Sequence, residues 1–129
     1  LANVSSALHY AFDRFFWTGF YLQRAENSLL LGPFQGTVAC FNIPIAKGVC
    51  GSAFAERRTL IVPDVEKFPG HIACSSESRS EIVVPFYDVK GEPVSVLDID
   101  SRELNAFDET DAHYLEKIMK VLTEKIYQR

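Results

Sequence analysis

Residues 81–100 read EIVVPFYDVKGEPVSVLDID. Apolar and β-branched side chains dominate both halves of this stretch, and a polar, glycine-containing turn at 90–92 separates them. The pattern predicts a β-hairpin with strands over 81–87 and 94–100. Because both strands are so apolar, we expect this hairpin in the middle of a sheet.

The same spacing rules predict the rest of the chain. Apolar residues at three- and four-residue steps predict a helix over 1–15 and a C-terminal helix that begins after the N-cap Asp108. The buried face of the C-terminal helix is expected to carry Ala112, Leu115, Ile118, Met119, Leu122 and Ile126. The other predicted elements are strands at 16–22, 29–31, 38–43 and 60–62, a helix at 49–57 and a long loop at 64–80. This order predicts an α+β fold: a central antiparallel sheet with the N- and C-terminal helices on one face and active-site loops on the other.

Composition narrows the class of protein. With 129 residues, of which 47% are hydrophobic, the chain is expected to form a single domain over 1–129. The net charge of −4 argues against nucleic acid or an anionic membrane as partner. We find no membrane-length apolar run and no signal peptide, and therefore expect a cytoplasmic protein. Because a patterned helix is already under way at Leu1, we expect that an N-terminal segment has been trimmed.

Cysteines occur at positions 40, 50 and 74. An odd number of cysteines without a secretion signal argues against a structural disulfide framework. The simplest interpretation is that each is a small buried apolar residue. However, Cys74 lies in the long loop and Cys50 at the start of a helix, where a thiol can be reached and activated. A zinc site is a weaker alternative, because the spacings lack a close cysteine pair, although His71 and Cys74 could share one side of a turn.

Acidic residues form a second group of candidates. Alternation along the strand sends Asp98 and Asp100 to one face, and Glu81 opens the neighbouring strand. A solvated strand end would explain the two aspartates without a function. If the three carboxylates share a pocket, they raise one another's pKa and can hold a proton or an ammonium group. Trp17 and Tyr21 share one strand face and form either core or the aromatic wall of such a pocket.

Taken together, the motifs resemble a known family. The ordered blocks are Leu31-Gly32-Pro33-Phe34-Gln35-Gly36, Gly48-Val49-Cys50-Gly51, Gly70-His71-Ile72-Ala73-Cys74, Ser80-Glu81-Ile82-Val83 and Val96-Leu97-Asp98-Ile99-Asp100-Ser101. They are similar to those of the free methionine-(R)-sulfoxide reductases built on a GAF domain. The resemblance implies a GAF fold, a homodimer, free methionine-(R)-sulfoxide as substrate, thioredoxin as reductant, and neither cofactor nor metal.

The resemblance also implies roles for the candidate residues. Cys74 corresponds to the nucleophile, Cys40 to the main resolving cysteine, and Cys50 to a third cysteine of less settled role. Glu81, Asp98 and Asp100 correspond to the carboxylates that hold the substrate and assist the sulfoxide oxygen, and Trp17 and Tyr21 to the aromatic pocket. Ser95 stands where the family more often has glycine, so that its hydroxymethyl group either narrows the pocket floor or faces the core.

The resulting hypothesis is a thiol-dependent reduction. Cys74 attacks the sulfoxide sulfur, Glu81 or Asp100 protonates the oxygen, and Cys40 then closes a disulfide with Cys74. Two other interpretations remain open at this point. One is a GAF ligand or redox sensor without turnover, and the other is a zinc-stabilised structural module.

Overall fold

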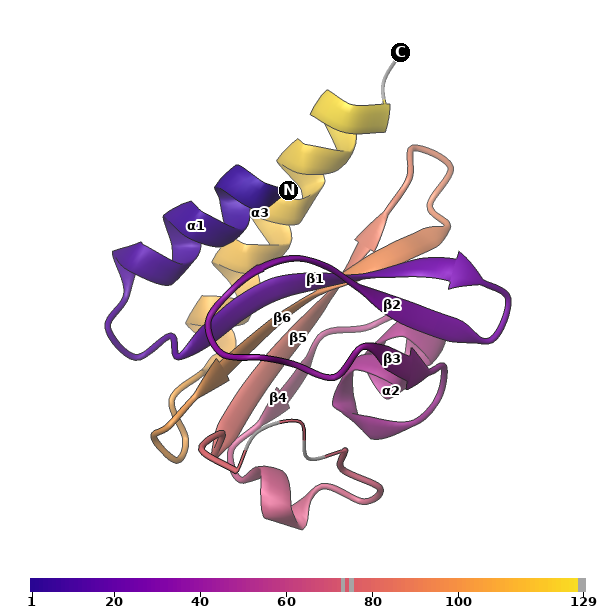
Figure 1. Cartoon of the computed structure of the whole chain (residues 1–129). Helices are drawn as coiled ribbons and strands as arrows, with labels where there is room; N and C mark the ends of the chain where they lie inside the picture. Colours follow the sequence, from indigo (N-terminus) through magenta and orange to yellow (C-terminus); the bar gives the residue numbers. More distant parts are fainter. Residues whose placement is uncertain (73, 75, 128–129) are drawn as a thin grey trace.

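The computed structural model describes residues 1–72, 74 and 76–127, which form a curled sheet with helices on both sides (Figure 1). The elements in order are α1 (Ala2–Ala11), β1 (Trp17–Ala25), β2 (Ser28–Gln35), β3 (Asn42–Pro44), α2 (Gly48–Glu56), β4 (Leu60–Val62), the 3-10 turn η1 (Val65–Lys67), β5 (Ser80–Tyr87), β6 (Pro93–Ser101) and α3 (Glu109–Tyr127). The strand order is β3-β2-β1-β6-β5-β4, and all paired neighbours are antiparallel. The predicted α+β class is confirmed, and the β5–β6 hairpin lies inside the sheet as expected.

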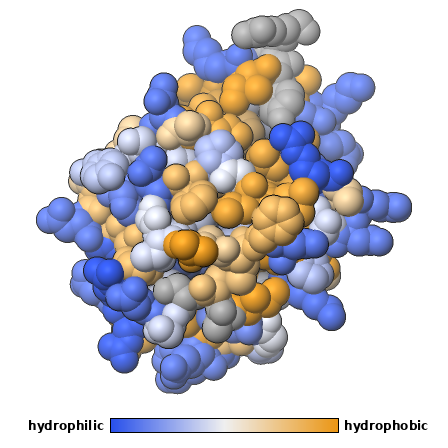
Figure 2. Space-filling model, viewed as in Figure 1, coloured by the Kyte–Doolittle hydropathy of each residue, from blue (hydrophilic) through white to orange (hydrophobic). Residues whose placement is uncertain are grey.

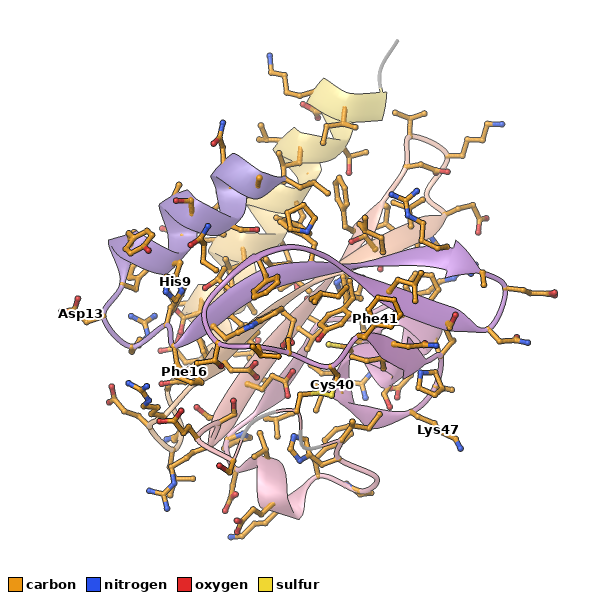
Figure 3. All side chains as sticks on the ribbon, viewed as in Figure 1. His9, Asp13, Phe16, Cys40, Phe41 and Lys47 are labelled. Carbon is orange, nitrogen blue, oxygen red and sulfur yellow. A yellow bond between two sulfur atoms is a disulfide. The ribbon has the colours of Figure 1, made fainter. Side chains whose placement is uncertain are left out.

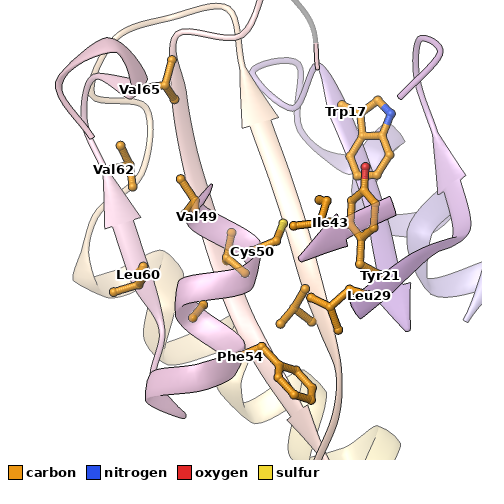
Figure 4. Packing of buried hydrophobic residues seen from close by; sticks show 13 residues of the cluster. Trp17, Tyr21, Leu29, Ile43, Val49, Cys50, Phe54, Leu60, Val62 and Val65 are labelled. Atoms are coloured by element: carbon orange, nitrogen blue, oxygen red, sulfur yellow. The ribbon is translucent and has the colours of Figure 1, made fainter. Parts of the chain in front are cut away.

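The two faces of the sheet are covered differently. The terminal helices α1 and α3 lie on one face, while α2 and the long loops lie on the other (Figure 1). The helix-side core consists of Phe15, Phe20, Ile82, Val84, Phe86, Leu97, Ile99, Phe107, Ala112, Leu115 and Met119. The pocket-side core, drawn in Figure 4, includes Trp17, Tyr21, Leu29, Ile43, Val49, Cys50, Phe54 and Val83. β1, β4, β5 and β6 therefore contribute alternate residues to two separate cores, as the period of two requires, whereas β2 and β3 contribute to the pocket-side core alone.

The C-terminal helix begins as the sequence predicts. The N–H of Asp111 donates to Oδ1 of Asp108 at 3.1 Å, and the N–H of Asp108 donates to Oδ2 of Asp111 at 2.9 Å. This reciprocal pair satisfies backbone donors that the first turn would otherwise leave free. The expected burial of Ile126 is wrong, because this side chain is 39% exposed near the end of α3. Within the described residues, no helix is sufficiently long and apolar to cross a bilayer.

The first helix is shorter than predicted. α1 ends at Ala11, and Phe12 is already extended, with φ −133° and ψ 121°. Tertiary contacts account for this end: Phe15 is buried in the helix-side core, and the N–H of Phe16 donates to the carbonyl of Asp100 at 2.8 Å. The apolar period that continues past Ala11 therefore belongs to a turn that enters the sheet.

The predicted strand over 38–43 is confirmed only at its end, where β3 (Asn42–Pro44) pairs with β2. Pairing begins only at Asn42, and residues 37–41 cross the molecule as a loop, which we call the strap. Two buried side chains hold its backbone: the indole N–H of Trp17 donates to the carbonyl of Thr37, and the hydroxyl of Tyr21 donates to the carbonyl of Cys40, both at 2.9 Å. These bonds replace the ladder that a strand would form.

Candidate functional site

A cavity lies on the pocket side of the sheet, enclosed by the strap, α2 and the loop that carries His71 and Cys74. The empty space, with its open mouth included, amounts to about 550 Å³. Its floor is formed by Trp17 and Tyr21 of β1, Asp98 and Asp100 of β6 and Glu81 of β5. All three kinds of predicted site residue, thiol, carboxyl and aromatic, thus contribute to one cavity.

Strand register brings the carboxyl groups together. Glu81 pairs directly with Asp100 across β5 and β6, and Asp98 follows two residues along on the same face. Glu81 and Asp98 are each only 5% exposed, and Asp100 is half-buried. A solvated strand end therefore does not describe these acids.

Burial and crowding change how these acids titrate. Burial raises the pKa of Glu81 well above its usual range, and the charges of Asp100 and Asp98 raise it further. Burial also raises the pKa of Asp98, although hydrogen bonds with Glu81 and Cys50 partly offset the effect. The pKa of Asp100 is well raised by burial and by the charge of Asp98. Carboxyl groups in this state can retain a proton near neutral pH and give it up to a substrate.

Asp98 carries an unused acceptor. Its Oδ1 has no hydrogen-bond partner among the described residues, although the side chain is buried. A buried acceptor without a donor costs about 1–3 kcal/mol. Since Asp98 lines the cavity, a cationic or N–H-bearing ligand bound against it would supply the missing partner.

Cys40 and Cys74 form a disulfide, with their Cα atoms 5.1 Å apart. It joins the strap to the loop between η1 and β5, segments separated by 34 residues in sequence. Coordination of a zinc ion by His71 and Cys74 together does not fit this structure, because the sulfur of Cys74 is bonded to Cys40 in the disulfide.

Cys50 is free and buried beneath the cavity, 3% exposed. Its Sγ lies 4.0 Å from Oε2 of Glu81, within reach of a weak S–H donation. Burial raises the pKa of this thiol, and the neighbouring Asp98 and Glu81 raise it further. The expectation that its place at the start of α2 activates Cys50 is therefore wrong: desolvation and acidic neighbours outweigh the helix terminus.

Only one group of described side chains has the donors and spacing for a metal ion. It consists of Cys50, Glu81 and Asp98, whose ligand atoms lie within 4.8 Å of one another. The same atoms form the floor of the cavity, so a metal there would compete with any ligand for it.

Trp17 and Tyr21 belong to the pocket-side core and also form a wall of the cavity. Trp17 stacks against Tyr21 with ring centroids 5.9 Å apart and against Phe34 at 5.2 Å, and both Trp17 and Tyr21 line the cavity while they remain almost fully buried. Gly19, between them on β1, is required for this packing, because a Cβ there would collide with Phe34 and with the Trp17 ring. The sequence analysis did not identify Gly19. It also did not predict that the indole N–H of Trp17 and the hydroxyl of Tyr21 hold the strap.

Ser95 faces away from the cavity. Alternation along β6 places it on the same side as Leu97 and Ile99, and its hydroxyl donates to the carbonyl of Tyr21 at 2.9 Å. Of the two alternatives for this residue, narrowing of the pocket floor is wrong.

Comparison with known proteins identifies the fold family. The GAF domain sequence model matches residues 11–124. GAF domain-containing protein A of Dictyostelium discoideum is 59% identical to this chain, over 95% of it and 76% of that protein. The free methionine-R-sulfoxide reductase of Saccharomyces cerevisiae is 47% identical, over 96% and 72% respectively.

A solved structure agrees closely. The free methionine-R-sulfoxide reductase of Neisseria meningitidis, determined in complex with its substrate, superposes with a TM-score of 0.92 at 51% identity, over 97% of this chain and 74% of that one. The chain therefore belongs to the GAF domain family, within the group that contains the free methionine-R-sulfoxide reductases.

Proposed function

We propose that this protein reduces free methionine-(R)-sulfoxide to methionine. The observation that carries the proposal is a redox-capable cysteine pair at a cavity whose floor consists of buried carboxyl groups. Relatives named as free methionine-R-sulfoxide reductases, one of them solved with its substrate, support the same conclusion.

The cavity has complementary parts for a free amino acid. An ammonium group finds acidic partners in Asp98 and Glu81, including the unpaired Oδ1 of Asp98. The apolar methyl and methylene groups beside the sulfoxide suit the stacked rings of Trp17 and Tyr21. A methionine sulfoxide within a peptide has no free ammonium group, so this floor favours the free amino acid.

The proposed reaction transfers two electrons. With Cys40 and Cys74 reduced, the Cys74 thiolate attacks the sulfoxide sulfur while Glu81 or Asp100 protonates the oxygen. Methionine leaves, and the oxygen remains on Cys74 as a sulfenic acid. The Cys40 thiol then attacks this sulfur, water departs, and the Cys40–Cys74 disulfide forms.

Cys50 has no electron-transfer step in this scheme. Its raised pKa keeps it a neutral thiol, which donates toward Glu81 and helps to orient that carboxyl group. We further propose that residues 1–129 act as a single GAF domain, that the protein is a cytoplasmic homodimer, and that thioredoxin reduces the disulfide.

A substrate test checks the activity. Pre-reduced protein is mixed with free methionine-R-sulfoxide, the S epimer, or a peptide-bound sulfoxide, and the methionine released is measured without added reductant. We expect about one methionine per chain, from the free R form alone. Release from the peptide form alone would refute the proposal, while binding of the free R form without any release would favour the sensor alternative.

A second measurement tests the order of the thiols. In Cys40→Ser, the sulfenic acid on Cys74 has lost its resolving thiol and should accumulate, so that dimedone can trap it. The matched control is Cys50→Ser, which keeps the Cys40–Cys74 pair and should give no dimedone adduct.

A further inference from the structure

The two sulfurs of the disulfide face different surroundings. Cys74 contributes to the lining of the cavity, whereas Cys40 does not and belongs to the strap above it. Both residues are half-buried. A small molecule inside the cavity therefore meets Cys74 rather than Cys40.

The strap carries exposed apolar side chains. Phe41, directly after Cys40, is 72% exposed, and Val38, which also lines the cavity, is 90% exposed. Figure 3 shows Cys40 and Phe41 beside one another on this segment, and Figure 2, in the same view, shows apolar surface across the middle of the face. No charged residue occurs between positions 27 and 46, although 23% of the chain is charged. Neutral surface with an exposed aromatic side chain is typical of the centre of a protein interface.

The strap is held firmly by hydrogen bonds to its backbone carbonyls. Hydrogen bonds from Trp17 and Tyr21 fix the carbonyls of Thr37 and Cys40, and the N–H of Leu31 donates to the carbonyl of Phe41 at 3.0 Å. A partner that binds here therefore meets a preorganised loop and loses little affinity to ordering it.

We propose that a dithiol protein of the thioredoxin class reduces this disulfide by attacking Sγ of Cys40, and that Phe41 is the main contact by which the reductant docks. The attacking thiolate approaches along the S–S axis from the side away from Cys74. A bond forms between the reductant sulfur and Cys40, the Cys40–Cys74 bond breaks, and Cys74 leaves as a thiolate. The second thiol of the reductant then attacks the mixed disulfide and releases Cys40, so that the reductant ends as a disulfide and two electrons have been transferred.

This direction of attack has a consequence for turnover and rests on the proposed function. Cys74 is released first, inside the cavity, where the substrate binds. Attack on Cys74 would instead place a protein on the sulfur that has to react, and the reductant would have to reach into the cavity.

The test for the attacked sulfur uses a thioredoxin whose second active-site cysteine is replaced by serine, so that the mixed disulfide is not resolved. The oxidised protein is mixed with this thioredoxin, alkylated rapidly with N-ethylmaleimide, digested and analysed by mass spectrometry. We expect thioredoxin on Cys40 and the alkyl group on Cys74. Thioredoxin on Cys74 would overturn the proposal.

The test for docking compares two exposed apolar residues. Phe41→Ser should lower the rate constant for reduction by wild-type thioredoxin about tenfold, the effect expected of an interface anchor, while reduction by dithiothreitol stays unchanged. Val89→Ser, at a 57% exposed site in the β5–β6 turn, is the matched control and should alter neither rate. An unchanged thioredoxin rate in Phe41→Ser, or an equal loss with dithiothreitol, would refute the role of Phe41.

The proposed activity and the proposed attack on Cys40 can be refuted independently of one another. Methionine release from pre-reduced protein needs no external reductant, so its absence would refute the activity whatever sulfur the thioredoxin variant labels. Labelling of Cys74 in a protein that does release methionine would refute only the direction of attack.

Discussion

The two faces of β5 and β6 are built from neighbouring residues yet have opposite chemistry. On the helix side, Ile82 and Ile99 are fully buried among apolar side chains. On the pocket side, Glu81 and Asp98 are almost as deeply buried, but they carry carboxyl groups, one with an oxygen that has no partner. Burial of apolar groups stabilises a fold, whereas burial of carboxylates opposes it. The comparison indicates that the helix side maintains the structure while the pocket side gives up stability to keep reactive groups.

The largest expected effect concerns the thiol at the cavity. Cys74→Ser should reduce methionine formation by roughly a thousandfold or more, since the proposed nucleophile is lost. The measurement is initial rate with free methionine-R-sulfoxide and dithiothreitol. Cys50→Ser, the matched control at a neutral buried thiol, should keep most of the rate. Substantial turnover in Cys74→Ser would show that another group attacks the sulfoxide.

Substitutions on the helix side of the sheet should lower the free energy of unfolding and leave substrate binding unchanged. Ile99→Ala removes apolar volume at a fully buried site and should lower the free energy of unfolding by about 2–5 kcal/mol. Urea denaturation measures this loss, and the KM of the remaining folded enzyme should be unchanged. A raised KM with little loss of stability would contradict the division between the two faces.

Substitutions on the pocket side should instead weaken substrate binding and leave the free energy of unfolding unchanged or higher. Asp98→Asn keeps the size of the side chain but removes its charge, and should raise KM about 10- to 100-fold, as expected for loss of a charge-assisted hydrogen bond. The free energy of unfolding should stay the same or rise, because a buried carboxyl is replaced by a neutral amide. A large loss of stability would mean that Asp98 supports the fold.

The pH dependence of stability sharpens the same comparison. The pKa values of Glu81 and Asp98 are raised in the folded state, above ordinary values of 4.5 and 3.8. The folded protein therefore retains protons that the unfolded chain releases. The stability that these two protonated groups contribute is fully present below about pH 4 and is lost as the pH rises through their raised pKa values. Each retained proton gives a slope of about 1.4 kcal/mol per pH unit. Urea denaturation between pH 4 and 8 should show a shallower decline for Glu81→Gln than for the wild type, whereas Glu92→Gln, at an exposed position, should match the wild type.

The smallest effect is expected at Ser95. Ser95→Gly removes the hydroxyl that bonds to the carbonyl of Tyr21 and should cost about 1–2 kcal/mol of stability. Because the side chain lies on the helix side of the sheet and not at the cavity, KM should change by less than about twofold. A large fall in KM would show that the serine does narrow the pocket.

Local pattern predicted much of this molecule. The hairpin over 81–100, the cap at Asp108 and the shared face of Asp98 and Asp100 depend only on spacing along one element, and the structure agrees with each. The face of Ser95 was available from the same alternation, since it lies two residues before Leu97. The sequence resemblance added the pairing of Cys40 with Cys74, which no spacing rule supplies.

Other features depended on distant contacts. The end of α1 at Ala11 follows from where Phe15 and Phe16 enter the core and the sheet. The strap is a loop rather than a strand because side chains of Trp17 and Tyr21, some 20 residues earlier, occupy its carbonyls. Burial raises the pKa of Cys50, and acids from β5 and β6 raise it further, so that this thiol stays neutral.

The sequence by itself thus determined the kinds of element, the face on which each strand residue lies, and the residue types able to carry thiol chemistry, because these follow from periods of two and 3.6 residues and from side-chain chemistry. Only the tertiary structure decided which thiol faces the cavity, which is buried beneath it, and how strongly the acids perturb one another. Direction, burial and electrostatic coupling depend on distances between segments far apart in the chain, and no local pattern contains those distances.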